Sequence, residues 1–155
     1  MLKSEIKHLF FSLLAGSLVG FFCRNYYSIP VAFLSGFFVD ADHLIDYGIY
    51  KKFRKFNLSE FLSGKFFDKS GKVYVFFHGF EYVPVLIVMG VVFSNLSWLF
   101  LSLGLSLFFH LCFDTIHNRT KRQSYFFTFR LINHFSHNDF CSTKKTGSND
   151  CTNKR

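Results

Sequence analysis

The sequence predicts an all-α fold, an integral membrane bundle of about four helices with a polar, metal-binding layer near its cytoplasmic side. Three observations predict it. Half of the 155 residues are hydrophobic, apolar residues gather in helix-length runs, and the 18 Lys and Arg residues lie mainly between those runs. This distribution is typical of a membrane protein whose cytoplasmic loops carry the basic residues. We expect one helical domain over residues 1–140 and a polar, disordered tail over residues 141–155.

The net charge of +8 at pH 7 suits either nucleic acid or an anionic membrane surface. Because the bases alternate with apolar segments, we expect the lipid bilayer as the partner and no nucleic acid. The four cysteines show no CxxC pair, so a disulfide framework is not expected. Residues 1–22 resemble a signal peptide but lack an Ala-x-Ala-like cleavage site, so we expect this segment to be retained.

The first two apolar segments are residues 8–22 and 30–50, joined by a polar connection. Small residues in the first segment would let another helix approach closely; they are Ala15, Gly16, Ser17 and Gly20. Pro30 opens the second segment at a position that helices accept in their first turn. Both segments are short for a complete membrane span.

Residues 51–72 form a hydrophilic link with seven Lys or Arg against two acids, interrupted by Gly64 and Gly71. The two most convincing spans follow, residues 73–93 and 96–117, each near the roughly 20 residues that a bilayer requires. Pro84 lies in the first of them, where neighbouring helices can satisfy the freed carbonyl. The basic residues before the first segment, in this link and after the fourth segment place both termini on the cytoplasmic side of the inner membrane.

Residues 40–46 (DADHLID) place three carboxylates and one imidazole inside an apolar segment. In surroundings of low dielectric constant such groups must be paired, protonated or bound to a cation. Carboxylate oxygens and imidazole nitrogens suit divalent zinc, manganese or iron. The motif therefore predicts a site for a divalent metal, with zinc as the first choice.

The ionisable residues of all four segments lie at similar depths, about 6 to 17 Å from the cytoplasmic helix ends at about 1.5 Å per residue. Four antiparallel helices would bring them into one polar layer. Its members are His8, Asp40, Asp42, His43, Asp46, His78, Glu81, His110 and Asp114.

Helical spacing supports this layer. His110 and Asp114, at positions i and i+4, share one helix face. Asp40 lies well round the helix from Asp42, so both can ligate only two different ions, or one ion if the helix is distorted. A buried salt-bridge network is the alternative, but the apolar segments hold five acids and no Lys or Arg to neutralise them.

Four stretches taken in order (HLFFS, FVDADHLID, FFHGFEY and HLCFDTIHN) resemble the YdjM-like family of membrane-bound, metal-dependent hydrolases of bacteria and archaea. The resemblance covers roughly residues 8–118. It implies a bundle of short helices in the cytoplasmic membrane. Many members have a second histidine in the third stretch, where Glu81 stands here. The ligands that the resemblance implies are His8, Asp40, Asp42, His43, His110 and Asp114.

We therefore expect a membrane-bound hydrolase that uses one or two divalent ions on a phosphoester or ester bond of a phospholipid or other amphiphile. His78 joins the implied ligands because it lies in the same layer, and Glu81 or Asp46 would accept the proton. Arg130 either meets an anionic headgroup or is a solvated charge. The alternatives are an ion site for transport or sensing, and a structural metal that clamps the bundle.

Overall fold

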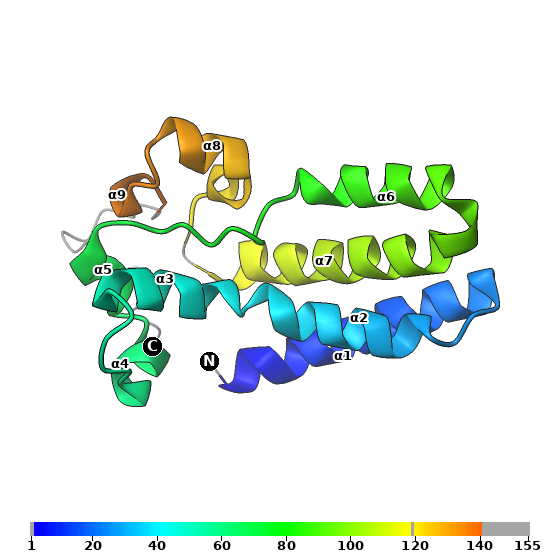
Figure 1. Ribbon diagram of the computed structural model, residues 1–155, viewed down its shortest axis with the longest axis horizontal. Coiled ribbons are helices and arrows are strands. Elements are labelled where there is room, and N and C mark those ends of the chain that lie inside the picture. Colours follow the sequence, from blue (N-terminus) through cyan, green and yellow to red (C-terminus); the bar gives the residue numbers. More distant parts are fainter. Residues whose placement is uncertain (1, 119, 141–155) are drawn as a thin grey trace. The chain divides into compact units, whose positions relative to one another are not determined.

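The computed structural model describes residues 2–118 and 120–140, with side chains from residue 6 onward. Every regular element in this part of the chain is a helix, apart from an isolated antiparallel bridge between Lys72 and Ser136. The all-helical prediction is confirmed, while the predicted tail lies outside the described residues. The elements are α1 (Leu2–Cys23), α2 (Ser28–Val39), α3 (Asp42–Lys51), α4 (Leu58–Ser63), α5 (Phe66–Ser70), α6 (Tyr82–Val92), η1 (Ser94–Leu96), α7 (Ser97–His117), η2 (Arg122–Tyr125), α8 (Phe127–Ile132) and α9 (His137–Phe140) (Figure 1).

The chain divides into two compact units. The first unit contains the chain up to Asp40 together with Gly79–Asp114, and so holds α1, α2, α6 and most of α7. The second contains Ala41–His78 and the described chain from Thr115 onward, and so holds α3, α4, α5, α8 and α9. The assignment of residues 1–140 to one domain stays a prediction.

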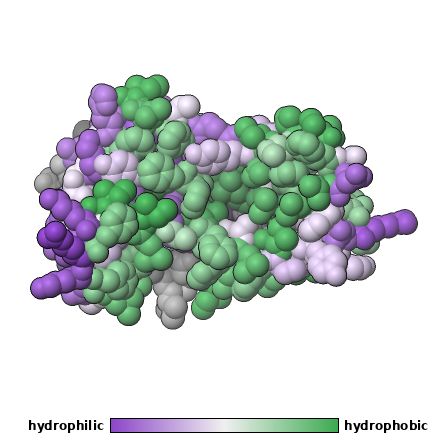
Figure 2. All heavy atoms as spheres, in the orientation of Figure 1, coloured by the Kyte–Doolittle hydropathy of each residue, from purple (hydrophilic) through white to green (hydrophobic). Residues whose placement is uncertain are grey.

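Three helical stretches are long and apolar enough to cross a membrane: Ile6–Cys23, Ser28–Lys51 and Ser94–His117. The first two are therefore longer than we expected from the sequence. Figure 2 shows mainly apolar side chains over the helices of the first unit, and several large ones are widely exposed, among them Phe21, Phe22 and Val91. An apolar surface of this kind on long helices indicates association with a membrane.

In the first unit, α1 and α2 form a hairpin with very close backbones. A Cβ atom added at Gly16 would lie 2.7 Å from the Ile29 Cα atom, and one added at Gly36 would lie 1.9 Å from the Ser12 Oγ atom. The prediction that small residues of the first segment allow a close helix is confirmed for Gly16. Ser17, by contrast, is exposed.

Buried hydroxyl groups tie this hairpin to α7 within the first unit. The Ser106 hydroxyl lies 2.9 Å from the Ala32 carbonyl oxygen, to which it donates, and 3.0 Å from the Ser12 Oγ atom. The Ser28 hydroxyl donates to the Gly16 carbonyl oxygen at 2.8 Å. Hydroxyls of this kind hydrogen-bond across closely packed membrane helices. They fix the register of α1 against α7, the two helices that carry His8 and His110.

The predicted membrane helix over residues 73–93 is wrong. α6 begins only at Tyr82 and has 11 residues, which gives a length of about 16 Å, roughly half the thickness of the hydrocarbon core. Pro84 lies in its first turn, where a missing N–H costs nothing, and it could not have continued a longer helix without breaking a hydrogen bond. η1 then connects α6 to α7.

The residues before α6 are held by carboxylates in place of helical hydrogen bonds. The backbone N–H groups of Tyr74 and Val75 donate to the Asp46 carboxylate at 2.9 and 3.2 Å. The Phe77 N–H donates to Asp42 Oδ2 at 2.8 Å. The two carboxylates thus accept the N–H hydrogen bonds of a non-helical segment, because buried backbone N–H groups need an acceptor. An apolar composition alone therefore did not make this segment a helix.

The hydrophilic link after α3 contains the two short helices α4 and α5. Each ends at a glycine in the left-handed region, Gly64 at φ 68° and Gly71 at φ 64°, as a helix C-terminus favours. Glu60 of α4 accepts hydrogen bonds from Lys51 at 2.6 Å and from the Tyr47 hydroxyl at 3.0 Å. The Lys51 hydrogen bond is the main cause that lowers the pKa of Glu60 to about 2.

Candidate metal centre

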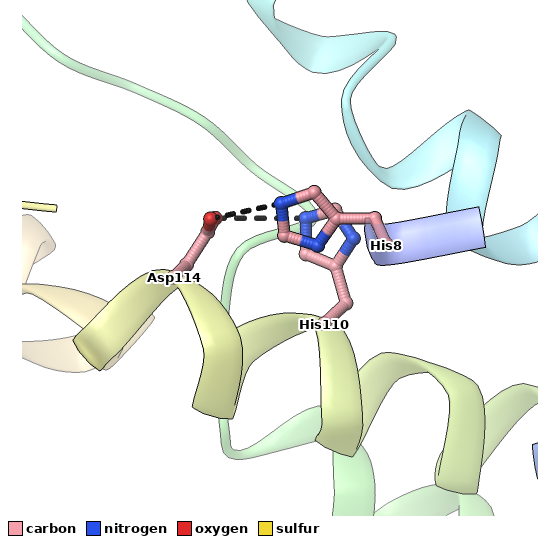
Figure 3. A group of neighbouring side chains, drawn as sticks. All are labelled: His8, His110 and Asp114. Atoms are coloured by element: carbon pink, nitrogen blue, oxygen red, sulfur yellow. Dashed lines mark ion pairs between the residues drawn. The ribbon is translucent and has the colours of Figure 1, made fainter. Parts of the chain in front are cut away.

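The first cluster consists of His8 on α1 with His110 and Asp114 on α7. The His8 Nε2 atom lies 3.3 Å from Asp114 Oδ1, and the His110 Nε2 atom lies 3.6 Å from Asp114 Oδ2. The two imidazoles are stacked, with centroids 4.1 Å apart, and both turn a ring nitrogen towards the Asp114 carboxylate (Figure 3). Asp40, just after α2, places its Oδ1 atom 3.5 Å from His110 Nε2. Four groups thus converge, from α1, from α7 and from the residue after α2.

The spacing in the first cluster is compatible with a shared metal ion. N–H···O hydrogen bonds in proteins usually measure about 2.7–3.2 Å, and the three nitrogen–oxygen distances here are 3.3, 3.5 and 3.6 Å. Two ligand atoms that each lie about 2.0–2.1 Å from a tetrahedral zinc ion are roughly 3.4 Å apart. The distances therefore fit atoms that share an ion better than atoms that share a proton.

Burial in the first cluster is uneven. His8 and His110 are almost completely enclosed, with 4% and 1% of their surface exposed, whereas the Asp40 side chain keeps 22%. The His8 Nδ1 atom is buried and has no hydrogen-bond partner among the described residues. Its neighbour is apolar, since the ring edge of Phe113 packs against His8 at 4.7 Å. The more open side of the cluster is thus the Asp40 side.

The second cluster consists of Asp42 and His43 at the start of α3 together with His78 from the segment before α6. Asp42 Oδ2 lies 2.9 Å from His78 Nδ1, which is a hydrogen-bond distance. Asp42 Oδ1 is buried without a hydrogen-bond partner in the described chain, and it lies 4.0 Å from His43 Nδ1. One carboxylate oxygen thus orients His78, as carboxylates commonly orient ligand histidines. The other oxygen is one of the atoms that could hold an ion.

A break between α2 and α3 separates the two adjacent aspartates. α2 ends at Val39 and α3 begins at Asp42, so Asp40 belongs to neither helix. Asp40 contacts His110, whereas Asp42 contacts His78. We expected these two carboxylates to serve different ions or to require a distorted helix, and the helix is indeed interrupted between them.

All seven residues expected to bind metal lie in one of these two neighbourhoods, and each cluster has ligand atoms that lie within 4.8 Å of one another and could hold an ion. The two expected bases are placed differently. Asp46 is buried and accepts hydrogen bonds from two backbone N–H groups. Glu81 is half-buried at the N-terminus of α6. A proton-accepting role stays a prediction for both.

Sequence reasoning missed the role of Arg130 in α8. Its side chain is 3% exposed, which excludes the solvated role. The guanidinium donates to the carbonyl oxygens of Val75, His78 and Ser124 at 3.0, 2.8 and 2.8 Å. An arginine inside the aromatic run FFTFRLI was the available signal, because a charge in such a run must find internal partners.

The chain is thus an all-helical protein with three apolar helices long enough to cross a membrane and two His/Asp clusters that could hold a metal ion. No known protein family, curated protein or solved structure matches the chain.

Proposed function

We propose that this chain is a membrane-bound, metal-dependent hydrolase whose principal ion is held by His8, His110 and Asp114, with Asp40 beside them. The observation that carries this proposal is the spacing of 3.3–3.6 Å between buried imidazole nitrogens and carboxylate oxygens. Zinc is the first choice, and manganese or iron suits the same donors. The second cluster would hold a further ion.

The donor set of the first cluster favours catalysis. Two imidazoles and a carboxylate form one of the ligand sets of catalytic zinc sites, which keep a position open for water or substrate. The enclosed histidines anchor the site, and the partly exposed Asp40 marks the side from which water and substrate would enter. A divalent ion held there supplies a Lewis acid, which polarises a phosphoryl or acyl oxygen and acidifies water.

Among the chain's own groups, Glu81 is the better candidate for the proton acceptor. It belongs to the same unit as the first cluster and is only half-buried. Asp46 already accepts two backbone hydrogen bonds that hold residues 74 and 75. We therefore assign proton transfer to Glu81 and a supporting role to Asp46.

The substrate follows from the surroundings of the site. Three apolar helices long enough to cross a membrane support contact with lipid, so we infer a phospholipid or another amphiphile with a phosphoester or ester bond as the substrate. The motif order that resembles the YdjM-like hydrolases supports the same reaction class. In this proposal the protein spans the cytoplasmic membrane of a bacterium or archaeon with both termini inside, which requires residues 73–92 to cross the membrane in addition to the three long helices.

A structural ion is the second candidate, and a specific observation favours it. The donors come from α1, from α7 and from the residue after α2, so an ion would tie three elements of the first unit together. This role predicts a large loss of thermal stability on chelation and no turnover.

Turnover assays of zinc-loaded, detergent-purified protein on phosphodiester and carboxylester substrates would separate these roles. We expect Asp114→Asn to lose both metal and turnover. Glu81→Gln should keep the metal and lose about 10²- to 10⁴-fold in rate, the usual contribution of a general base. Ser17→Gly, exposed on α1 and outside both clusters, is the control. Loaded protein that turns over neither substrate class but loses stability with a chelator would favour the structural ion.

A further inference from the structure

His78 lies at the end of a strained turn. The His78 N–H donates to the Val75 carbonyl oxygen at 3.0 Å, which closes a β-turn over residues 75–78. Val75 has a φ of +35°, a backbone conformation that a β-branched residue rarely adopts. Such strain persists only where surrounding contacts enforce it, and it is frequent at functional sites.

The contacts that enforce the turn come from two buried charged side chains. The Asp46 carboxylate accepts the N–H groups of Tyr74 and Val75 at 2.9 and 3.2 Å. On the other edge, Arg130 Nη2 donates to the Val75 carbonyl oxygen at 3.0 Å and Nη1 donates to the His78 carbonyl oxygen at 2.8 Å. The two terminal nitrogens of one guanidinium thus hold the first and the last carbonyl of the turn.

The β-turn over residues 75–78 also sets the position of the His78 ring. Its Nδ1 atom lies 2.9 Å from Asp42 Oδ2, and the same oxygen accepts the Phe77 N–H of the turn at 2.8 Å. A shift of the turn would therefore move both donors away from Asp42 together. All of these residues belong to the second unit.

We propose that Arg130 is a positioning residue for the second cluster: by bridging the two carbonyls of the turn, it keeps the His78 ring hydrogen-bonded to Asp42 and ready to bind an ion. The metal-binding part of this inference rests on the proposed function, whereas the hydrogen bond does not. Arginine suits the task because its planar fork presents two donors at a fixed separation, which a lysine ammonium cannot do.

The test uses the full chain with Asp114→Ala as the parent, so that the first cluster is removed and the second is observed alone. The variants are Arg130→Ala, Arg130→Lys and, as the control, Arg122→Ala, an exposed arginine of the same unit. Two measurements are made on each. The first is the ¹⁵N spectrum of the histidine rings in metal-free protein, which reports the His78 tautomer and its hydrogen bond. The second is titration with Co²⁺, followed by its visible absorption.

We expect the His78 Nδ1–H signal in the parent and the control, and its loss in Arg130→Ala, with Arg130→Lys restoring it in part. The dissociation constant for Co²⁺ should rise about 10- to 100-fold in Arg130→Ala, as is usual when a group that orients a ligand is removed. Circular dichroism of each variant shows whether the helices are intact.

A normal His78 ring signal in a folded Arg130→Ala variant would overturn the positioning role, regardless of the dissociation constant for Co²⁺. If Arg130→Ala does not fold, the His78 ring signal is compared between Arg130→Lys and the parent. A signal of full strength in Arg130→Lys would likewise overturn the positioning role. A parent that shows the His78–Asp42 hydrogen bond but binds no Co²⁺ would overturn metal binding at this cluster and leave the positioning of His78 supported.

Discussion

Gly36→Ala should destabilise the protein although alanine is the better helix former. The new Cβ atom would lie 1.9 Å from Ser12 Oγ and 2.9 Å from Ser12 Cβ, where ordinary contact begins at 3.4 Å. The hydroxyl can rotate away but the Cβ atom cannot, so α1 and α2 must separate. Overpacking costs about 2 kcal/mol, loss of the Ser106–Ser12 hydrogen bond about 1 kcal/mol, and helix propensity returns about 1 kcal/mol. The net loss is about 2 kcal/mol.

The reciprocal exchange makes this prediction specific. Ser12→Gly alone should cost about 1.5 kcal/mol, of which helix propensity contributes about 0.5 kcal/mol and the lost hydrogen bond about 1 kcal/mol. In the double variant the clash is absent and the alanine gain of about 1 kcal/mol exceeds the glycine cost of about 0.5 kcal/mol. The loss should therefore be about 0.5 kcal/mol, where additivity would give about 3.5 kcal/mol.

Unfolding of detergent-purified protein, followed by the fluorescence of the single tryptophan, measures each free energy. Ser17→Gly, on the exposed face of α1, is the matched control for helix propensity. A Gly36→Ala variant as stable as the parent, or additive losses in the double variant, would refute the close approach of α1 and α2.

Three further predictions concern the second unit and the membrane topology. Asp46→Ala leaves two buried backbone N–H groups without their acceptor, so amide exchange at Val75 should accelerate and stability should fall by about 2–4 kcal/mol; unchanged exchange would contradict the role of Asp46. Because the pKa of Glu60 is lowered from 4.5 to about 2, its contact stabilises the fold above pH 4.5 and is lost as the pH falls towards 2. The melting temperature of Glu60→Gln should therefore be lower than that of the parent at pH 6 and converge with it near pH 2. A difference in melting temperature that stays constant with pH would argue against the contact. In a background without native cysteines, a cysteine at Lys55 should react with an impermeant reagent only from the cytoplasmic side and one at Tyr26 only from outside, and labelling of both from one side would overturn the topology.

Local patterns predicted a large part of this structure. The apolar run of residues 8–22 and that of residues 96–117 are helices because their side chains suit a lipid-facing or buried helix over a long stretch. His110 and Asp114 meet because the spacing i, i+4 alone brings two side chains together on a helix. The crowded acids of residues 40–46 correctly indicated a polar site, since no local partner could neutralise them.

The wrong helix prediction and the missed role of Arg130 both concern features that depend on contacts between residues distant in sequence. Residues 73–81 have the composition of a membrane helix, yet their N–H groups bind Asp42 and Asp46, which lie 28 to 35 positions earlier. Hydropathy reports side chains and does not report which group satisfies the backbone. Arg130 was missed for the same reason, because its partners are carbonyl oxygens, which every residue possesses.

The measurement that tests the central claim most directly is metal content together with X-ray absorption at the zinc edge, on protein purified in detergent and loaded with zinc. His8→Ala and His110→Ala are compared with the parent and with the control variant Ser17→Gly. We predict that the parent and the control bind zinc through nitrogen and oxygen at about 2.0–2.2 Å. Each histidine variant should fold and lose about one equivalent. Well-folded parent protein that retains no zinc, or histidine variants that retain all of it, would contradict the account and leave the first cluster as a buried hydrogen-bonded network.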